Sequence, residues 1–140
     1  MAIKLHYEVP GDDFTRAGEA SGAVKGKLKQ LGFPADVIRR VAIAMYEGEI
    51  NMVIHANGGT ADVEIDPDQV RITLSDQGPG IPDLNLAMQE GWSTATETVR
   101  DLGFGAGMGL PNIKKYSDTL EIDTAPGQGT TMRMTVFVNN

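Results

Sequence analysis

The chain has 140 residues, of which 41% are hydrophobic and 22% charged, and we expect residues 1–140 to fold as one domain. It contains no cysteine, which excludes disulfides and thiolate metal sites. Its formal net charge of −7 argues against a nucleic-acid-binding surface, which needs a basic face.

No apolar run approaches the ~20 residues that span a bilayer, and the N-terminal stretch "MAIKLHYEVP" lacks the apolar segment of a signal peptide. The sequence therefore predicts a cytoplasmic protein that works without a membrane or a nucleic acid.

Hydrophobic periodicity predicts a strand, two helices, two strands, a helix and two strands, in that order. The predicted strands are 3–9, 61–65, 70–76, 119–123 and 130–138. The predicted helices are 13–31, 35–57 and about 110–117. Because hairpins outnumber crossovers, the pattern favours two layers with a mostly antiparallel sheet.

The second predicted helix carries Glu47 and Asn51 one turn apart, with His55 a further turn along the same stripe. A carboxylate can deprotonate a nucleophile, and an amide oxygen can bind Mg²⁺. Glu49 is a rival base, but it lies about 200° around the helix from Glu47 and away from Asn51. The alternative interpretation of the pair is an ordinary solvated helix face.

Asp76 ends the strand 70–76, and Gly78 and Gly80 follow it directly. A carboxylate at a strand end can accept a hydrogen bond from the exocyclic amine of an adenine, and the glycines would let the ring lie against the backbone. The alternative is a plain Asp-Gly turn.

Alternate residues from 103 to 109 are glycine, and a helix follows. Bare backbone amides at a helix start bind anions, most often phosphate. The run does not satisfy G-x-G-x-x-G, and the phosphate-loop motif G-x-x-x-x-G-K-[ST] is absent, which excludes those two modes of nucleotide binding. A surface loop is the alternative. Thr130, in "GQGTT", begins the last strand and could complete a polar pocket.

Taken in order, Glu-x-x-x-Asn, D-x-G-x-G, G-x-G-x-G-L and G-T-T resemble the N, G1, G2 and G3 boxes of the GHKL (Bergerat-fold) ATPases, across about residues 37–135. The resemblance implies an α+β two-layer sandwich in which helices cover one face of a mixed, mostly antiparallel sheet. It also implies ATP and Mg²⁺ as cofactors.

Within that superfamily the chain resembles the bacterial serine/threonine kinases and anti-sigma regulatory factors (RsbT-, RsbW- and SpoIIAB-like proteins). The segments "GWSTA" and "GMGLPNIKKY" are most similar to the stressosome switch kinases. The chain departs from them in the eleven residues 96–106, which lengthen the predicted lid over the nucleotide.

The resemblance implies a role for each matching residue. Glu47 would be the catalytic base and Asn51 the magnesium ligand. The adenine site would comprise Asp76, Gly78, Gly80 and Thr130. The triphosphate would lie against the backbone of Gly105, Gly107, Met108, Gly109 and Leu110.

The function implied is a protein serine/threonine kinase that phosphorylates a STAS-domain protein in a partner-switching pathway. One alternative is an anti-sigma factor that sequesters a sigma factor and depends on ATP; another is an ATP-binding regulator with residual hydrolysis. A phosphatase acting downstream and a homodimer are further partners that the family resemblance suggests.

Overall fold

The structure is a computed structural model that describes residues 2–11, 16–56, 58–78, 109–124 and 127–138. Its strands are β1 (Ile3–Pro10), β2 (Gly58–Ile65), β3 (Gln69–Asp76), β4 (Thr119–Thr124) and β5 (Thr130–Phe137). Its helices are α1 (Glu19–Gln30), α2 (Ala35–His55) and α5 (Gly109–Tyr116). All eight predicted elements are present in the predicted order.

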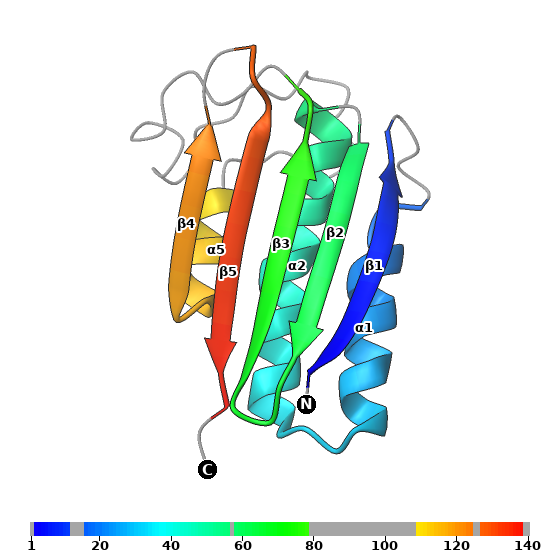
Figure 1. Cartoon of the computed structure of the whole chain (residues 1–140), viewed down its shortest axis with the longest axis vertical. Helices are drawn as coiled ribbons and strands as arrows, with labels where there is room; N and C mark the ends of the chain where they lie inside the picture. Colours follow the sequence, from blue (N-terminus) through cyan, green and yellow to red (C-terminus); the bar gives the residue numbers. More distant parts are fainter. Residues whose placement is uncertain (1, 12–15, 57, 79–108, 125–126, 139–140) are drawn as a thin grey trace.

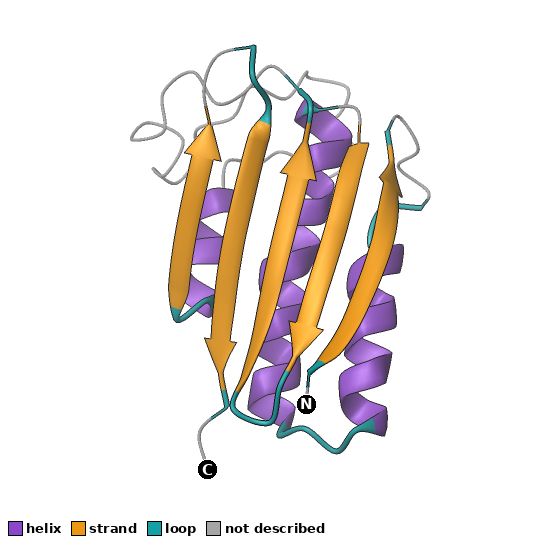
Figure 2. Cartoon of the chain, viewed as in Figure 1, coloured by secondary structure: helices purple, strands orange, loops and turns teal. Residues whose placement is uncertain are grey.

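The five strands form one sheet in the order β1-β2-β3-β5-β4, and every neighbouring pair is antiparallel. The three helices lie on one face of this sheet (Figure 1), and the colouring by secondary structure in Figure 2 separates the two layers clearly. The expected two-layer α+β sandwich is therefore confirmed, and its described strand pairs are antiparallel throughout.

Apolar residues at alternate strand positions make up the core and meet the inner stripe of α2. On the sheet side Ile72 is fully buried, and on the helix side Val41 and Met45 are too. The inner stripe of α2 is buried at four positions spaced along one face of the helix, comprising Val37, Val41, Met45 and Met52. Among the described residues no helix is both long and apolar enough to cross a membrane.

Helix α1 begins at Glu19, so the prediction that it starts at residue 13 is wrong. Gly18, directly before it, has φ of +96°, a left-handed conformation that does not continue a helix. The predicted end at residue 31 agrees with the structure, in which α1 ends at Gln30 and Gly32 has φ of +80°. There the amides of Gly32 and Phe33 donate to the carbonyls of Lys29 and Leu28, which satisfies two carbonyls at the helix end.

Helix α2 packs closely on the sheet at Gly48. A Cβ built on Gly48 would collide with Cδ1 of Leu74 in β3. A side chain at this position would therefore have to displace the buried side chain of Leu74.

We expect Gly48→Ala to lower the free energy of unfolding by about 1–3 kcal/mol, the range for overpacking a core. Chemical denaturation measures the change. Gly26→Ala is the matched control, because Gly26 lies in α1 and a Cβ there would meet nothing within 4 Å. The control should be as stable as wild type or up to about 1 kcal/mol more stable. Equal effects of the two substitutions would contradict the packing argument.

Candidate functional site

Four elements bring the predicted site residues that the structure describes toward one end of the molecule. The end of β3, the start of β5, the last turns of α2 and the first turn of α5 all lie toward the top of Figure 1. In the sheet, Asp76 is paired directly with Thr130 across β3 and β5. The G1 and G3 boxes, more than fifty residues apart in sequence, are therefore adjacent.

Asp76 is a buried carboxylate whose two oxygens have different surroundings. Its side chain is 7% exposed, and Oδ1 accepts the amides of Gly78, at 2.9 Å, and Thr130, at 3.1 Å. No hydrogen bond joins Oδ2 to the described residues. Because Oδ1 is already satisfied, Oδ2 is the oxygen suited to accept a hydrogen bond from a ligand donor such as an adenine amine.

Two glycines let the backbone close around Asp76. A Cβ on Gly78 would lie 2.5 Å from the Cβ of Ala56, at the end of α2. A Cβ on Gly129, which has φ of +79°, would collide with the backbone oxygen of Asp76. Only glycine fits at these two positions. The two glycines therefore allow β3, β5 and α2 to pack closely around the carboxylate.

Thr130 is 5% exposed, and its hydroxyl hydrogen-bonds to that of Thr124 at 2.9 Å. The Thr130 amide donates to Asp76, so this residue contributes to the site through both its backbone and its side chain. The pocket that Thr130 is expected to complete stays a prediction.

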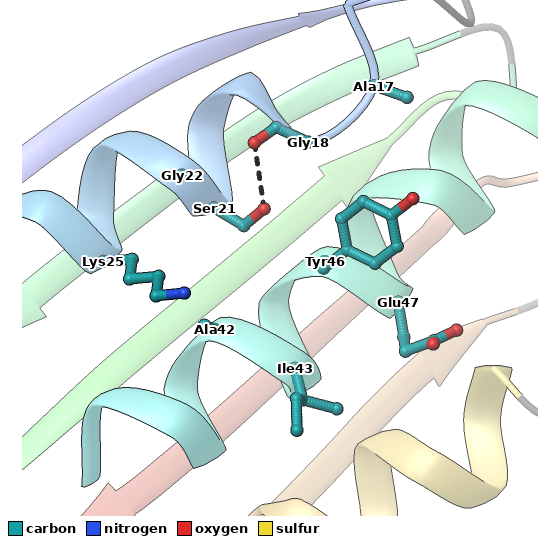
Figure 3. Close-up of a pocket in the computed structure, with 9 residues that line it drawn as sticks. All are labelled: Ala17, Gly18, Ser21, Gly22, Lys25, Ala42, Ile43, Tyr46 and Glu47. Atoms are coloured by element: carbon teal, nitrogen blue, oxygen red, sulfur yellow. Dashed lines mark hydrogen bonds between the residues drawn. The ribbon is translucent and has the colours of Figure 1, made fainter. Parts of the chain in front are cut away.

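Glu47 is half-buried on α2, and its side chain is directed toward α5 (Figure 3). Burial raises the pKa of Glu47 above its ordinary value, and a hydrogen bond with the Asn112 side chain opposes the rise. A carboxylate with a raised pKa is a better general base near neutral pH than an exposed one. Asn51 follows one turn later on α2 and is partly buried.

The sequence motifs do not predict that Asn112 lies at the candidate site. This residue lies in the first turn of α5, the helix that packs against α2 beside the site. Its signal is a polar residue just after the glycine run, between the buried Leu110 and Ile113. That signal identifies a residue near the site but does not identify Glu47 as its partner, because the partner lies 65 positions earlier (112 − 47).

Glu49, the rival base, has a different task. It is 1% exposed, and its carboxylate accepts the amides of Gly18, Ala20 and Ser21 at 3.0, 3.1 and 3.0 Å. These are amides at the N-terminal end of α1, where backbone donors lack partners within the helix. Glu49 therefore caps α1 from a neighbouring helix and faces away from the site.

The described residues cover only part of the predicted phosphate site. Gly80, Gly105, Gly107 and Met108 lie outside them. Gly109 is the first residue of α5, and the Leu110 side chain is 7% exposed and belongs to the core. A role for Gly109 and Leu110 thus rests on their backbone.

The described residues contain no group of three or more His, Asp or Glu side chains that could hold a metal ion by itself. A single amide ligand such as Asn51 fits a Mg²⁺ ion that takes its other oxygens from phosphates and water. The donor set therefore agrees with a metal carried by a nucleotide.

Comparison with known families decides the assignment. The model of the histidine kinase-, DNA gyrase B- and HSP90-like ATPases matches residues 36–140. The chain belongs to this ATPase family. Membership implies ATP binding, and it confirms the resemblance of the chain to GHKL ATPases.

The curated relatives include a serine/threonine-protein kinase and several anti-sigma F factors. The serine/threonine-protein kinase RsbT of Bacillus subtilis is 33% identical over 73% of this chain and 74% of its own length. The anti-sigma F factor of Caldanaerobacter subterraneus is 30% identical over 99% of this chain and 93% of its own length. The anti-sigma F factor of Pasteuria penetrans is 32% identical over 87% of this chain and 85% of its own length.

Solved structures agree on the fold. The RsbU and RsbW domains of a Mycobacterium tuberculosis protein match 99% of this chain, over 33% of theirs, with a TM-score of 0.65 and 16% identity. The mycobacterial sensor histidine kinase MprB matches 96% of this chain, over 97% of its own, with a TM-score of 0.54 and 18% identity. At these identities the likeness concerns the fold alone.

Replacing the α1 cap should destabilise the protein. We expect Glu49→Gln to lower the free energy of unfolding by about 2–3 kcal/mol. The substitution removes hydrogen bonds to a charged acceptor, and the NH₂ group of the glutamine side chain would face backbone N–H groups, which are also donors. Urea denaturation followed by circular dichroism measures the change. Glu121→Gln, on an exposed position of β4, is the control and should stay within about 0.5 kcal/mol of wild type.

The raised pKa of Glu47 predicts a pH dependence of stability. Because the folded-state pKa lies above the ordinary 4.5, the folded protein holds this proton more tightly, and stability falls as pH rises from that value through the folded pKa. The variant Glu47→Gln cannot titrate at this position, so it does not lose this stability as the pH rises. The free energy of unfolding of Glu47→Gln, minus that of wild type, should therefore increase from acid to neutral pH. The same difference at both pH values would contradict the burial argument.

Proposed function

We propose that this protein, as a single domain over residues 1–140, is an ATP-dependent serine/threonine kinase that phosphorylates a STAS-domain protein in a bacterial partner-switching pathway. The observation that carries the proposal is the position of the half-buried Glu47 carboxylate, which lies one helical turn before Asn51 on α2 and is directed toward α5. The relative RsbT, named a serine/threonine-protein kinase, supports the same activity.

In this proposal Asp76 binds the adenine through the oxygen that its backbone contacts leave available. Gly78 keeps the neighbouring backbone close enough for the ring to lie against it, and Gly80 would extend the same surface. Thr130 holds the Asp76 carboxylate in place through its amide. The Asp76 carboxylate accepts only from a hydrogen-bond donor, so it selects the edge of the adenine that carries the amine. These adenine contacts orient the nucleotide, and no charged side chain has to bind its phosphates.

Asn51 would hold Mg²⁺ by its amide oxygen, and backbone amides from Gly105 to Leu110 would surround the phosphates. When bound, Mg²⁺ neutralises charge on the phosphate oxygens. Glu47 accepts the proton of the substrate hydroxyl on a carboxylate oxygen, and Asn112 keeps that carboxylate oriented. Placement and charge neutralisation supply most of the catalysis in phosphoryl transfer, so this small set of groups suffices for a slow regulatory kinase.

An anti-sigma factor is the second candidate. The Caldanaerobacter and Pasteuria relatives carry that name, and a chain of net charge −7 suits a basic partner. A nucleotide regulator with residual hydrolysis needs the same adenine site but no role for Glu47. The three candidates therefore differ in what happens to the phosphate and to the partner.

Mixing the protein with Mg-ATP and the STAS-domain protein encoded beside it tests the kinase. We expect intact mass spectrometry to show one added phosphoryl group on the acceptor. Glu47→Ala should slow transfer by roughly 100-fold or more, the usual contribution of a general base. ATP affinity measured by calorimetry should remain unchanged in this variant.

Asp76→Asn is the complementary variant, because it replaces an acceptor oxygen with a donor. Its ATP affinity should fall by roughly tenfold or more, since a hydrogen bond to a charged group is lost. Absence of transfer by wild-type protein, together with stoichiometric capture of a sigma factor, would contradict the kinase and favour the anti-sigma factor. Hydrolysis that Glu47→Ala leaves unchanged would favour the third candidate.

A further inference from the structure

A groove of about 490 Å³ runs between α1 and α2 (Figure 3). It is lined by both helices, with Gly22 and Lys25 on α1 and Ala42, Ile43 and Tyr46 on α2. A Cβ on Gly22 would meet nothing within 4 Å, so the space at this position is open.

The groove reaches the candidate catalytic residue. Glu47 lines it and also has Asn112 of α5 as its hydrogen-bond partner, so this carboxylate stands between the groove and the candidate nucleotide site. A hydroxyl delivered to Glu47 from the α1 side would have to come from a chain lying along this groove.

The chemistry of the lining defines what fits. Tyr46 leaves 39% of its surface exposed and, with Ile43, offers an apolar wall. Figure 3 shows Lys25 extending from α1 toward α2, and the described residues provide no carboxylate in ion-pair contact with it. An apolar side chain and an acidic side chain are therefore complementary to the groove.

The spacing adds a geometric constraint. Ala42 and Glu47 are five positions apart on α2, which is about 7.5 Å along the helix axis. An extended chain covers this length in two or three residues, at about 3.3 Å each. A segment that lies along α2 would thus cover the length from Ala42 to Glu47 in two or three residues.

We propose that the α1/α2 groove docks the phosphoacceptor segment of the substrate protein. An acidic side chain pairs with Lys25, an apolar side chain packs on Ile43 and Tyr46, and a serine or threonine hydroxyl lies at Glu47. The proposal rests on the proposed kinase function, and it assigns substrate recognition to α1 and α2 rather than to the nucleotide boxes.

Two groove variants, Lys25→Glu and Ile43→Asp, test the proposal against two matched controls. Lys29→Glu makes the same charge change on α1 outside the groove, and Leu31→Asp replaces an apolar residue that is 40% exposed at the end of α1. Biolayer interferometry measures affinity for the STAS-domain protein encoded beside this chain. Steady-state phosphorylation gives KM and kcat, and calorimetry gives ATP affinity.

We expect the groove variants to raise both Kd and KM for the acceptor at least tenfold, with kcat and ATP affinity unchanged, and the controls to match wild type. Lys25→Arg should keep wild-type affinity. Groove variants that bind and phosphorylate the acceptor as wild type does would overturn the docking site and leave the kinase intact. Groove-dependent binding without phosphorylation would support the docking site and overturn the kinase. No binding by wild type would overturn the docking site.

Discussion

The bonding of the Glu49 carboxylate to three backbone amides of α1 is the interaction on which the helical layer depends. It places a nearly inaccessible charge in the core, which is unfavourable unless hydrogen bonds replace the lost water. The donors are amides that the start of a helix leaves without internal partners. One residue of α2 thus both satisfies its own charge and fixes where α1 begins, and α1 supplies one wall of the groove beside Glu47.

Three consecutive residues of α2 divide the work of the domain because successive helical positions point about 100° apart. Glu47 faces α5 and the candidate site, Gly48 contacts β3, and Glu49 holds α1. The lack of a side chain at Gly48 leaves room for Leu74 of β3, about 100° around the helix from the half-buried Glu47. Burial on this neighbouring side of the helix raises the pKa of Glu47.

Most of the fold could be predicted from the sequence, since strong periodicity places α2, β3 and β5 within a few residues. The start of α1 could not, because it is set by the positive φ of Gly18 and by a cap from Glu49, 31 positions away. In the candidate site, the motifs identify Asp76 and Thr130 separately. Their pairing depends on the register between β3 and β5, which no local pattern specifies. The same holds for the Glu47–Asn112 contact.

The sequence contains a signal for the role of Glu49, which is a charged residue at a position where the helical pattern predicts the core. The residue lies four positions after Met45 and four before Val53, both buried, so it interrupts an apolar stripe. A carboxylate there needs several donors, and the nearest supply of unsatisfied donors in a two-layer fold is the start of an adjacent helix. By the same reasoning Glu47, outside that stripe, remains available for chemistry. The difference between the two glutamates is thus one of direction around the helix, and it separates the carboxylate that caps α1 from the proposed base.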